Sequence, residues 1–158
     1  MNPRQSFRSL FRPLFRLVPL LAVLSLSGCL QDSASYAFPE KDHAITLIRN
    51  QPWFWLDTAN IEVIAIRLPD CNDGITLDAV PRDAKLTLYR APDEYPEPIF
   101  ILKTDKRHLA ISTQSCGVQV FKETPADLGE SLGQFQEKDG KFQFVADKPG
   151  AAASAQAE

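Results

Sequence analysis

Hydrophobic and polar residues alternate with a period of two along much of the chain between residues 42 and 147. Such alternation is typical of β-strands with one buried face, because successive side chains point to opposite sides of a strand. We expect strands at 44–49, 60–68, 75–80, 84–90, 99–103, 108–113 and 117–122, and two more within 134–145. Strands at spacings of about ten residues, separated by Pro and Gly turns, predict a mostly β domain: a single small β-sandwich or partly open β-barrel with one short helix.

Two hairpins and the helix have local signals of their own. Asp139-Gly140 is a two-residue turn of the kind that joins antiparallel strands, and nearby phenylalanines would form the core face of that hairpin. The apolar residues 99–102 and the strand at 108–113 predict a second hairpin, with 99–102 in the centre of a sheet. The single helix signal is Thr124-Pro125-Ala126-Asp127, with Thr124 as the cap and Pro125 at the first helical position.

The stretch Trp53-Phe54-Trp55-Leu56 would be apolar on both faces of a strand. Burial is the simpler expectation, because aromatic side chains dominate small cores. The alternative is that Trp53 and Trp55 are presented to a partner, or form a stacking platform for a small ligand or glycan.

Two segments rich in carboxylates are expected to be turns or loops. Pro69 to Gly74 is predicted to be a solvated turn, since its acidic residues do not match the spacing of a calcium-binding loop. Residues 91–98 hold three prolines and three acidic residues, which predict a stiff extended connection that does not pair in a sheet. The functional alternative is a presented binding loop with Tyr95 at its tip.

Sequence motifs for catalysis are not found. There is no Gly-x-Ser-x-Gly, Ser-x-x-Lys or His-Glu-x-x-His, and no glycine-rich phosphate loop or cofactor fingerprint. His108 and Ser112 would share a strand face but lie too far apart for a direct hydrogen bond. We therefore expect no catalytic residues, no metal and no cofactor.

The start of the chain has the pattern of a secretory signal. Four arginines and no acidic residue precede an apolar run from Leu17 to Leu26, and small residues follow that run. The run is too short for a membrane-spanning helix, which takes roughly 20 apolar residues.

The ending Leu26-Ser27-Gly28-Cys29 resembles the lipobox of bacterial lipoprotein precursors. The resemblance covers residues 1–29 and implies that the signal 1–28 is cleaved and that Cys29 is acylated. The protein would then be held on a lipid bilayer, because each buried methylene of an acyl chain contributes about 0.8 kcal/mol. Leu30 is not the aspartate that typically retains such proteins at the inner membrane, so the resemblance points to the outer membrane, periplasmic face.

This interpretation divides the chain into the signal 1–28, a lipidated tether 29–41, a β-rich domain 42–147 and a disordered tail 148–158. Without residues 1–28 the chain has 13 basic and 20 acidic residues, a net charge near −7. Such a charge argues against nucleic acid or anionic headgroups as the main partner.

The three cysteines support one disulfide. If Cys29 carries lipid, Cys71 and Cys116 are left, and two cysteines in an oxidising compartment predict a bond between them. A metal pair or a reactive thiol is the weaker alternative.

The function that these observations favour is a non-enzymatic lipoprotein that binds an envelope protein or supports an envelope assembly. The alternatives are a small-ligand or glycan binder that uses Trp53 and Trp55, and, least favoured, a hydrolase. A groove lined by both tryptophans would favour the ligand binder, whereas a protruding loop with Tyr95 would favour the protein partner.

Overall fold

The computed structural model describes residues 30–39, 42–53 and 55–147. The predicted signal 1–28, the predicted lipid attachment at Cys29, Phe54 and the predicted tail 148–158 lie outside the described residues.

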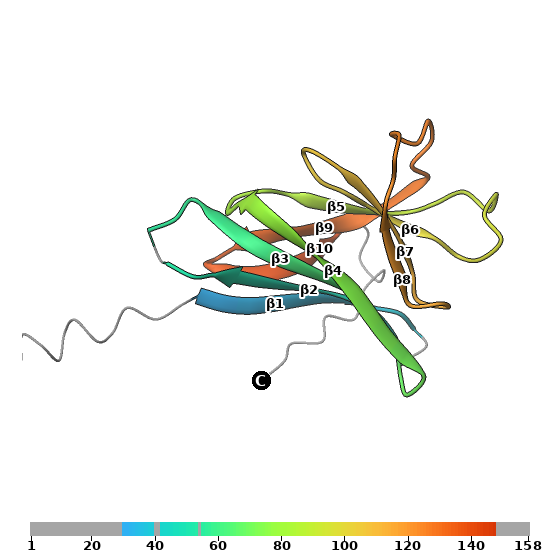
Figure 1. Ribbon diagram of the computed structural model, residues 1–158, viewed down its shortest axis with the longest axis horizontal. Coiled ribbons are helices and arrows are strands. Elements are labelled where there is room, and N and C mark those ends of the chain that lie inside the picture. Colours follow the sequence, from blue (N-terminus) through green and yellow to red (C-terminus); the bar gives the residue numbers. More distant parts are fainter. Residues whose placement is uncertain (1–29, 40–41, 54, 148–158) are drawn as a thin grey trace, which may run out of the picture.

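The described residues form ten β-strands in two antiparallel sheets (Figure 1). The first sheet has the order β1-β2-β3-β4 and the second the order β10-β9-β5-β6-β7-β8. The strands of the first sheet are β1 (Leu30–Ala37), β2 (His43–Gln51), β3 (Thr58–Arg67) and β4 (Cys71–Pro81). Those of the second are β5 (Leu86–Arg90), β6 (Phe100–Lys103), β7 (His108–Ser112), β8 (Gly117–Val120), β9 (Glu130–Lys138) and β10 (Lys141–Ala146).

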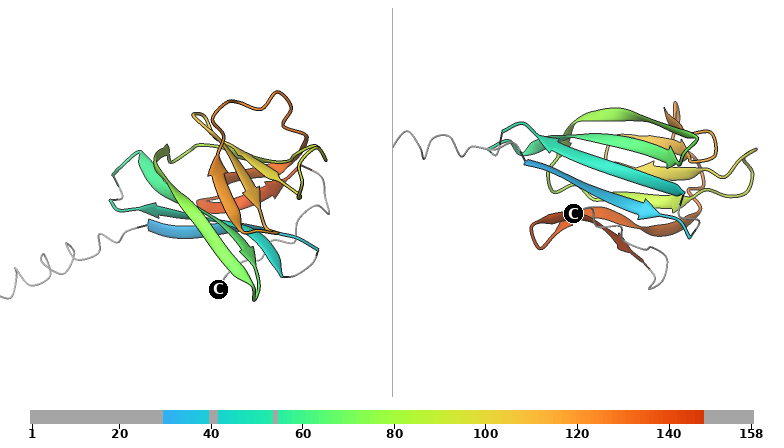
Figure 2. Two further views of the ribbon diagram at one scale, coloured as in Figure 1. Left: turned by 45° about the vertical axis from the view of Figure 1, so that its right-hand side comes forward. Right: turned by 90° about the horizontal axis from the view of Figure 1, so that it is seen from below.

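The two sheets pack face to face as a sandwich and do not close into a barrel (Figure 2). Alternate residues of each strand point between the sheets, as the period of two predicts; Ile61, Val63 and Ala65 of β3 are buried. Leu86 and Leu88 of β5 face them from the second sheet, in the same apolar core. The predicted mostly β class and the sandwich are confirmed.

Both hairpins predicted from local signals are confirmed. β9 and β10 pair around Asp139-Gly140, and both turn residues have positive φ, 56° and 76°. Glycine reaches this backbone conformation at no steric cost, and Asp is one of the few other residues that tolerate it. β6 pairs with β7 in the interior of the second sheet, and Phe100, Ile101 and Leu102 are all buried.

The prediction of a tether over 30–41 is wrong for residues 30–37, which form the edge strand β1. The segment is poor in large apolar residues, but Ala34 and Tyr36 both face the core and are buried. Each residue of β1 also has a partner in β2, from Leu30 opposite Gln51 to Ala37 opposite Ala44. Backbone pairing and one large aromatic side chain therefore replace the apolar alternation that was missing from the sequence.

Three other local predictions are wrong. The turn expected at Pro69 to Gly74 covers only 68–70, because β4 already begins at Cys71 and Gly74 lies opposite Ile64 in the ladder. Glycine suits that position since an added Cβ would come within 2.3 Å of the carbonyl oxygen of Val63.

The helix expected at 124–127 does not form, and no helix occurs in the part of the chain that the structure describes. The carboxylate of Asp127 instead accepts a hydrogen bond from the Gly129 N–H and closes a local turn.

The burial expected for the two tryptophans is the third of these errors. Trp53 and Trp55 lie in the loop between β2 and β3 and are 53% and 58% exposed. The loop begins after Pro52, beyond the end of the ladder, so neither ring points between the sheets.

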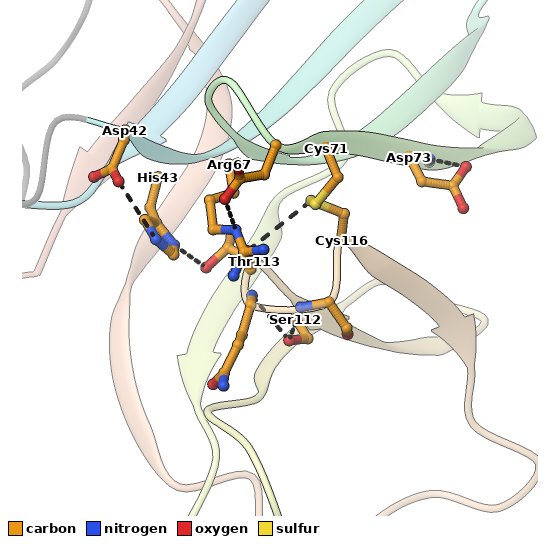
Figure 3. The surroundings of a disulfide bond; sticks show 12 residues. Asp42, His43, Arg67, Cys71, Asp73, Ser112, Thr113 and Cys116 are labelled. Atoms are coloured by element: carbon orange, nitrogen blue, oxygen red, sulfur yellow. Dashed lines mark hydrogen bonds and ion pairs between the residues drawn. A yellow bond between two sulfur atoms is a disulfide. The ribbon is translucent and has the colours of Figure 1, made fainter.

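Two covalent or ionic links join the sheets. The predicted disulfide between Cys71 and Cys116 is confirmed, with Cα atoms 6.1 Å apart (Figure 3). It ties the start of β4 to the turn before β8. On the far side, the buried guanidinium of Arg49 on β2 contacts Asp32 of β1 and Glu137 of β9.

Candidate functional site

A concave surface lies at one end of the sandwich, beneath the proline-rich loop 91–98 that joins β5 to β6. It is a cleft of about 660 Å³. The loop forms one wall, and residues from the ends of β2 and β3 and from the turn after β7 form the other. In Figure 1 this loop projects from the right-hand end of the molecule.

The loop is held in place at its base and along its length. The Ala91 N–H donates to the carbonyl oxygen of Ile99 across the base, at 3.0 Å. The hydroxyl of Ser115, in the turn before β8, donates to the carboxylate of Glu97 at 2.8 Å. Three prolines between these contacts restrict the backbone further. The acidic loop is therefore a positioned element of the cleft.

The opposite wall contains polar groups from three segments (Figure 3). The imidazole Nδ1 of His43 lies 2.9 Å from the hydroxyl of Thr113, a contact that joins β2 of the first sheet to the turn after β7 in the second. The guanidinium Nε of Arg67, at the end of β3, lies 3.2 Å from a carboxylate oxygen of Asp70. The disulfide stands beside these groups and fixes the two turns that carry them.

Aromatic rings lie at the inner end of the cleft. Phe38 and Phe100 both line it, with ring centroids 4.8 Å apart in an edge-to-face arrangement. Tyr36 packs against Phe38 from the core side, at 4.9 Å. Its burial raises the pKa of the Tyr36 phenol, an effect that the nearby charge of Arg90 opposes, so the phenol keeps its proton at neutral pH.

The charged groups around the cleft have both signs. Arg67 and Arg90 line it, together with Asp93 and Glu97 of the loop. Tyr95, predicted to be at the tip of the loop, is half-buried and also lines the cleft, whereas Asp93 and Glu94 are exposed. A surface of this kind, with aromatic and Arg side chains beside exposed carboxylates, suits recognition of a polar partner with an aromatic or apolar anchor.

Sequence reasoning missed the contact between His43 and Thr113, which are 70 residues apart. Asp42 adds a carboxylate, so a carboxyl group, an imidazole and a hydroxyl stand in a row. The Asp42 carboxylate is 3.9 Å from Nε2, beyond hydrogen-bonding distance, and Thr113 is 5% exposed. The contact between His43 and Thr113 links the two sheets. The pair His108 and Ser112 is not brought together: the Ser112 hydroxyl accepts hydrogen bonds from the N–H groups of Gln114 and Ser115.

Trp53 and Trp55 do not line the cleft, and they lie at the other end of the sandwich. His43 begins β2 beside the cleft, and Gln51 ends it beside the tryptophan loop, a separation of about 26 Å for a nine-residue strand. The structure therefore separates two groups of predicted site residues, with Tyr95 and the disulfide at one end and the tryptophans at the other.

Within residues 30–39, 42–53 and 55–147, no three His, Cys, Asp or Glu side chains gather in a group that could hold a metal ion. The same residues include no helix with the length and apolar character needed to cross a membrane. Comparison of the chain with protein-family models, with curated proteins and with solved structures finds no match.

Proposed function

We propose that this protein is a non-enzymatic lipoprotein of the bacterial envelope, anchored in the membrane through Cys29, that binds another envelope protein at the cleft beneath residues 91–98. The observation that carries the proposal is the position of this cleft. It lies at the end of the sandwich opposite Leu30, the residue that follows Cys29, so an anchored domain would hold its cleft away from the bilayer.

The chemistry of the cleft supports a protein partner. The cleft is lined by the half-buried Tyr95 and by two arginines. Tyrosine and arginine are among the residue types that contribute most of the binding energy in protein interfaces. The exposed carboxylates of Asp93 and Glu94, and the net charge near −7 of the chain without residues 1–28, favour a partner with a basic contact surface, because complementary charge speeds association and selects partners.

The partner half of the proposal is tested by site-specific photocrosslinking in living cells. A photoreactive phenylalanine analogue at position 95 should give one discrete adduct with an envelope protein, and the Arg67→Ala variant should weaken that adduct. The matched control is the same analogue at Asp78, an exposed residue of β4 that does not line the cleft. Identical adducts from both positions, or none from position 95, would contradict the proposal.

The anchor half is tested by fractionation. Cys29→Ser should move the protein from the membrane fraction to the soluble fraction. The control is the double variant Cys71→Ser, Cys116→Ser, which also loses cysteines but keeps Cys29 and should stay in the membrane fraction. A Cys29→Ser protein that fractionates as the wild type does would show that the anchor is elsewhere.

A small ligand in the same cleft is the second candidate. The volume of about 660 Å³ falls within the range of roughly 300–1,000 Å³ that is usual for small-molecule sites. Native mass spectrometry of protein extracted from membranes separates the two candidates. A bound small molecule that the Arg67→Ala variant loses, with no adduct from position 95, would favour the ligand.

A further inference from the structure

The loop between β2 and β3 presents an apolar surface at the end of the domain that the anchor would approach. Trp53 and Trp55 stack with ring centroids 5.0 Å apart and an interplanar angle of 19°, and each is more than half exposed. Large aromatic side chains with this exposure are costly to leave in water and usually mark a contact surface.

The loop holds the two rings in a defined place. The buried side chain of Gln51 donates a hydrogen bond to the carbonyl oxygen of Leu56 across the base of the loop. The Leu56 N–H donates to the carbonyl oxygen of Trp53 at 3.1 Å, and the Arg82 N–H donates to the carbonyl oxygen of Asp57 at 2.8 Å. The tryptophans are thus preorganised for contact.

The register of β1 and β2 places this loop beside the point where Cys29 joins the domain. Leu30 lies directly opposite Gln51, and one peptide bond separates Leu30 from Cys29. Standard backbone lengths then keep the Cα atoms of Leu30 and Trp53 within about 13 Å of each other. In Figure 1 the start of β1 and the loop between β2 and β3 share the left-hand end of the molecule.

We propose that Trp53 and Trp55 insert into the headgroup region of the bilayer that holds the acylated Cys29, and so orient the domain with its cleft facing away from the membrane. This inference rests on the proposed anchor at Cys29. Tryptophan suits the role because its large ring prefers the boundary between hydrocarbon and water, where the indole N–H can still find a hydrogen-bond partner.

The charges at this end argue that the contact depends on the rings and not on attraction to anionic lipid. Exposed charges of both signs lie at this end: the cations Arg82, Lys85, Lys138 and Lys141, and the anions Asp57, Asp83 and Asp139. With both signs present, the tryptophans are the groups that would set the depth and tilt of the domain.

The chain has two tryptophans, so its tryptophan fluorescence, excited selectively over that of tyrosine, reports on this loop alone. The lipidated protein is reconstituted into vesicles of phosphatidylethanolamine and phosphatidylglycerol, with and without phospholipids that carry bromine on their acyl chains near the headgroup. We expect a shift of the emission maximum to shorter wavelength on the vesicles and a loss of intensity with the brominated lipid. Flotation of the same samples measures anchoring independently.

The control moves the reporter to the cleft end. In a Trp53→Phe, Trp55→Phe background, which keeps a large apolar ring at both positions of the loop, Leu68→Trp places a single tryptophan at a position that is 60% exposed, in the turn after β3. We expect this variant to float and to keep its full intensity with brominated lipid.

Each of the other outcomes overturns the inference in a distinguishable way. If the protein floats but Trp53 and Trp55 are not quenched, the anchor is supported and the loop does not insert into the bilayer. Equal quenching of the loop tryptophans and of the tryptophan at position 68 would exclude a fixed orientation of the domain on the membrane. Emission that responds to peptidoglycan fragments and not to lipid would assign the loop to glycan binding. A protein that does not float contradicts the anchor, and the inference fails with it.

Discussion

Arg49 and Asp32 form a two-point ion pair across the β1–β2 ladder. Nε and Nη2 of Arg49 donate to the two carboxylate oxygens of Asp32 at 2.8 and 2.7 Å, and the two residues are register partners. The third nitrogen, Nη1, donates to Glu137 of β9 at 2.8 Å, while the ring of Phe142 lies 5.0 Å from the guanidinium carbon. One buried cation therefore holds together three strands from both sheets.

Replacing Arg49 should lower the free energy of unfolding more than replacing the nearby exposed Arg82 does. Arg49→Met leaves Asp32 and Glu137 without their buried partner, and because these carboxylates are 23% and 27% exposed we expect a cost of about 3 kcal/mol, the lower end of the range for breaking a buried pair. The control is Arg82→Ala, which removes an exposed contact to the same Glu137 carboxylate and should cost about 1 kcal/mol or less. Urea unfolding monitored by circular dichroism measures both. Equal losses would mean that the network contributes no more than a surface pair.

Stability should fall in acid partly through Glu137. The hydrogen bond from Arg49 holds the pKa of the Glu137 carboxyl below its ordinary value of 4.5, and Arg82 adds to the effect. Because the folded pKa is the lower one, the ionised carboxylate stabilises the fold above the unfolded pKa, and this contribution is lost as pH falls through the folded pKa. We expect Glu137→Gln to lower the free energy of unfolding at neutral pH and to reduce its slope with pH in this acid range. Urea titrations of both proteins at a series of pH values test the slope, and parallel curves would contradict the assignment.

The disulfide should contribute a large share of the stability. It closes a loop with a sequence separation of 45, for which chain entropy predicts about 4 kcal/mol. The double variant Cys71→Ser, Cys116→Ser should therefore unfold at a markedly lower urea concentration than the oxidised protein. Thiol titration of denatured wild-type protein purified without reductant should detect neither cysteine. Two reactive thiols there would show that the bond does not form in the cell.

Gly74 should not tolerate a side chain, although its φ is not positive. In Gly74→Ala the added Cβ would meet the carbonyl oxygen of Val63 at 2.3 Å, so the β3–β4 ladder must shift, and such overpacking typically costs about 1–3 kcal/mol. Gly117→Ala is the matched control, because its new Cβ would have no neighbour nearer than 3.5 Å. Thermal unfolding should separate the two variants, and equal melting temperatures would contradict the close approach.

The direction of β2 places the cleft and the tryptophan loop at opposite ends of the domain. A strand of nine residues carries the chain from His43 at the cleft to Gln51 beside Trp53, so the two candidate contact surfaces face opposite ways. An anchor next to Leu30 would then place one surface at the bilayer and the other about 26 Å further out. A photocrosslink at position 95 tests the cleft and quenching of Trp53 and Trp55 tests the loop, whereas flotation tests the anchor on which the membrane contact of the loop depends.

The sequence by itself determined the strand pattern, because alternation needs only the local rule that neighbouring side chains point to opposite faces. The hairpin at Asp139-Gly140 followed from local φ preferences, and the Cys71–Cys116 bond from the number of cysteines. The same period requires alternate residues of a strand to face the core, as the buried Leu86 and Leu88 do.

The tertiary structure alone decided which polar and aromatic residues meet. Arg49 continues the inward-facing series of β2, a signal that the sequence contained, but its partners Asp32 and Glu137 come from two other strands. β1 was missed because backbone pairing with β2 stabilises it more than its own side chains do. Trp53 and Trp55 were expected inside because hydrophobicity does not reveal where a ladder ends, and a loop beyond the last pair of residues has no core to enter.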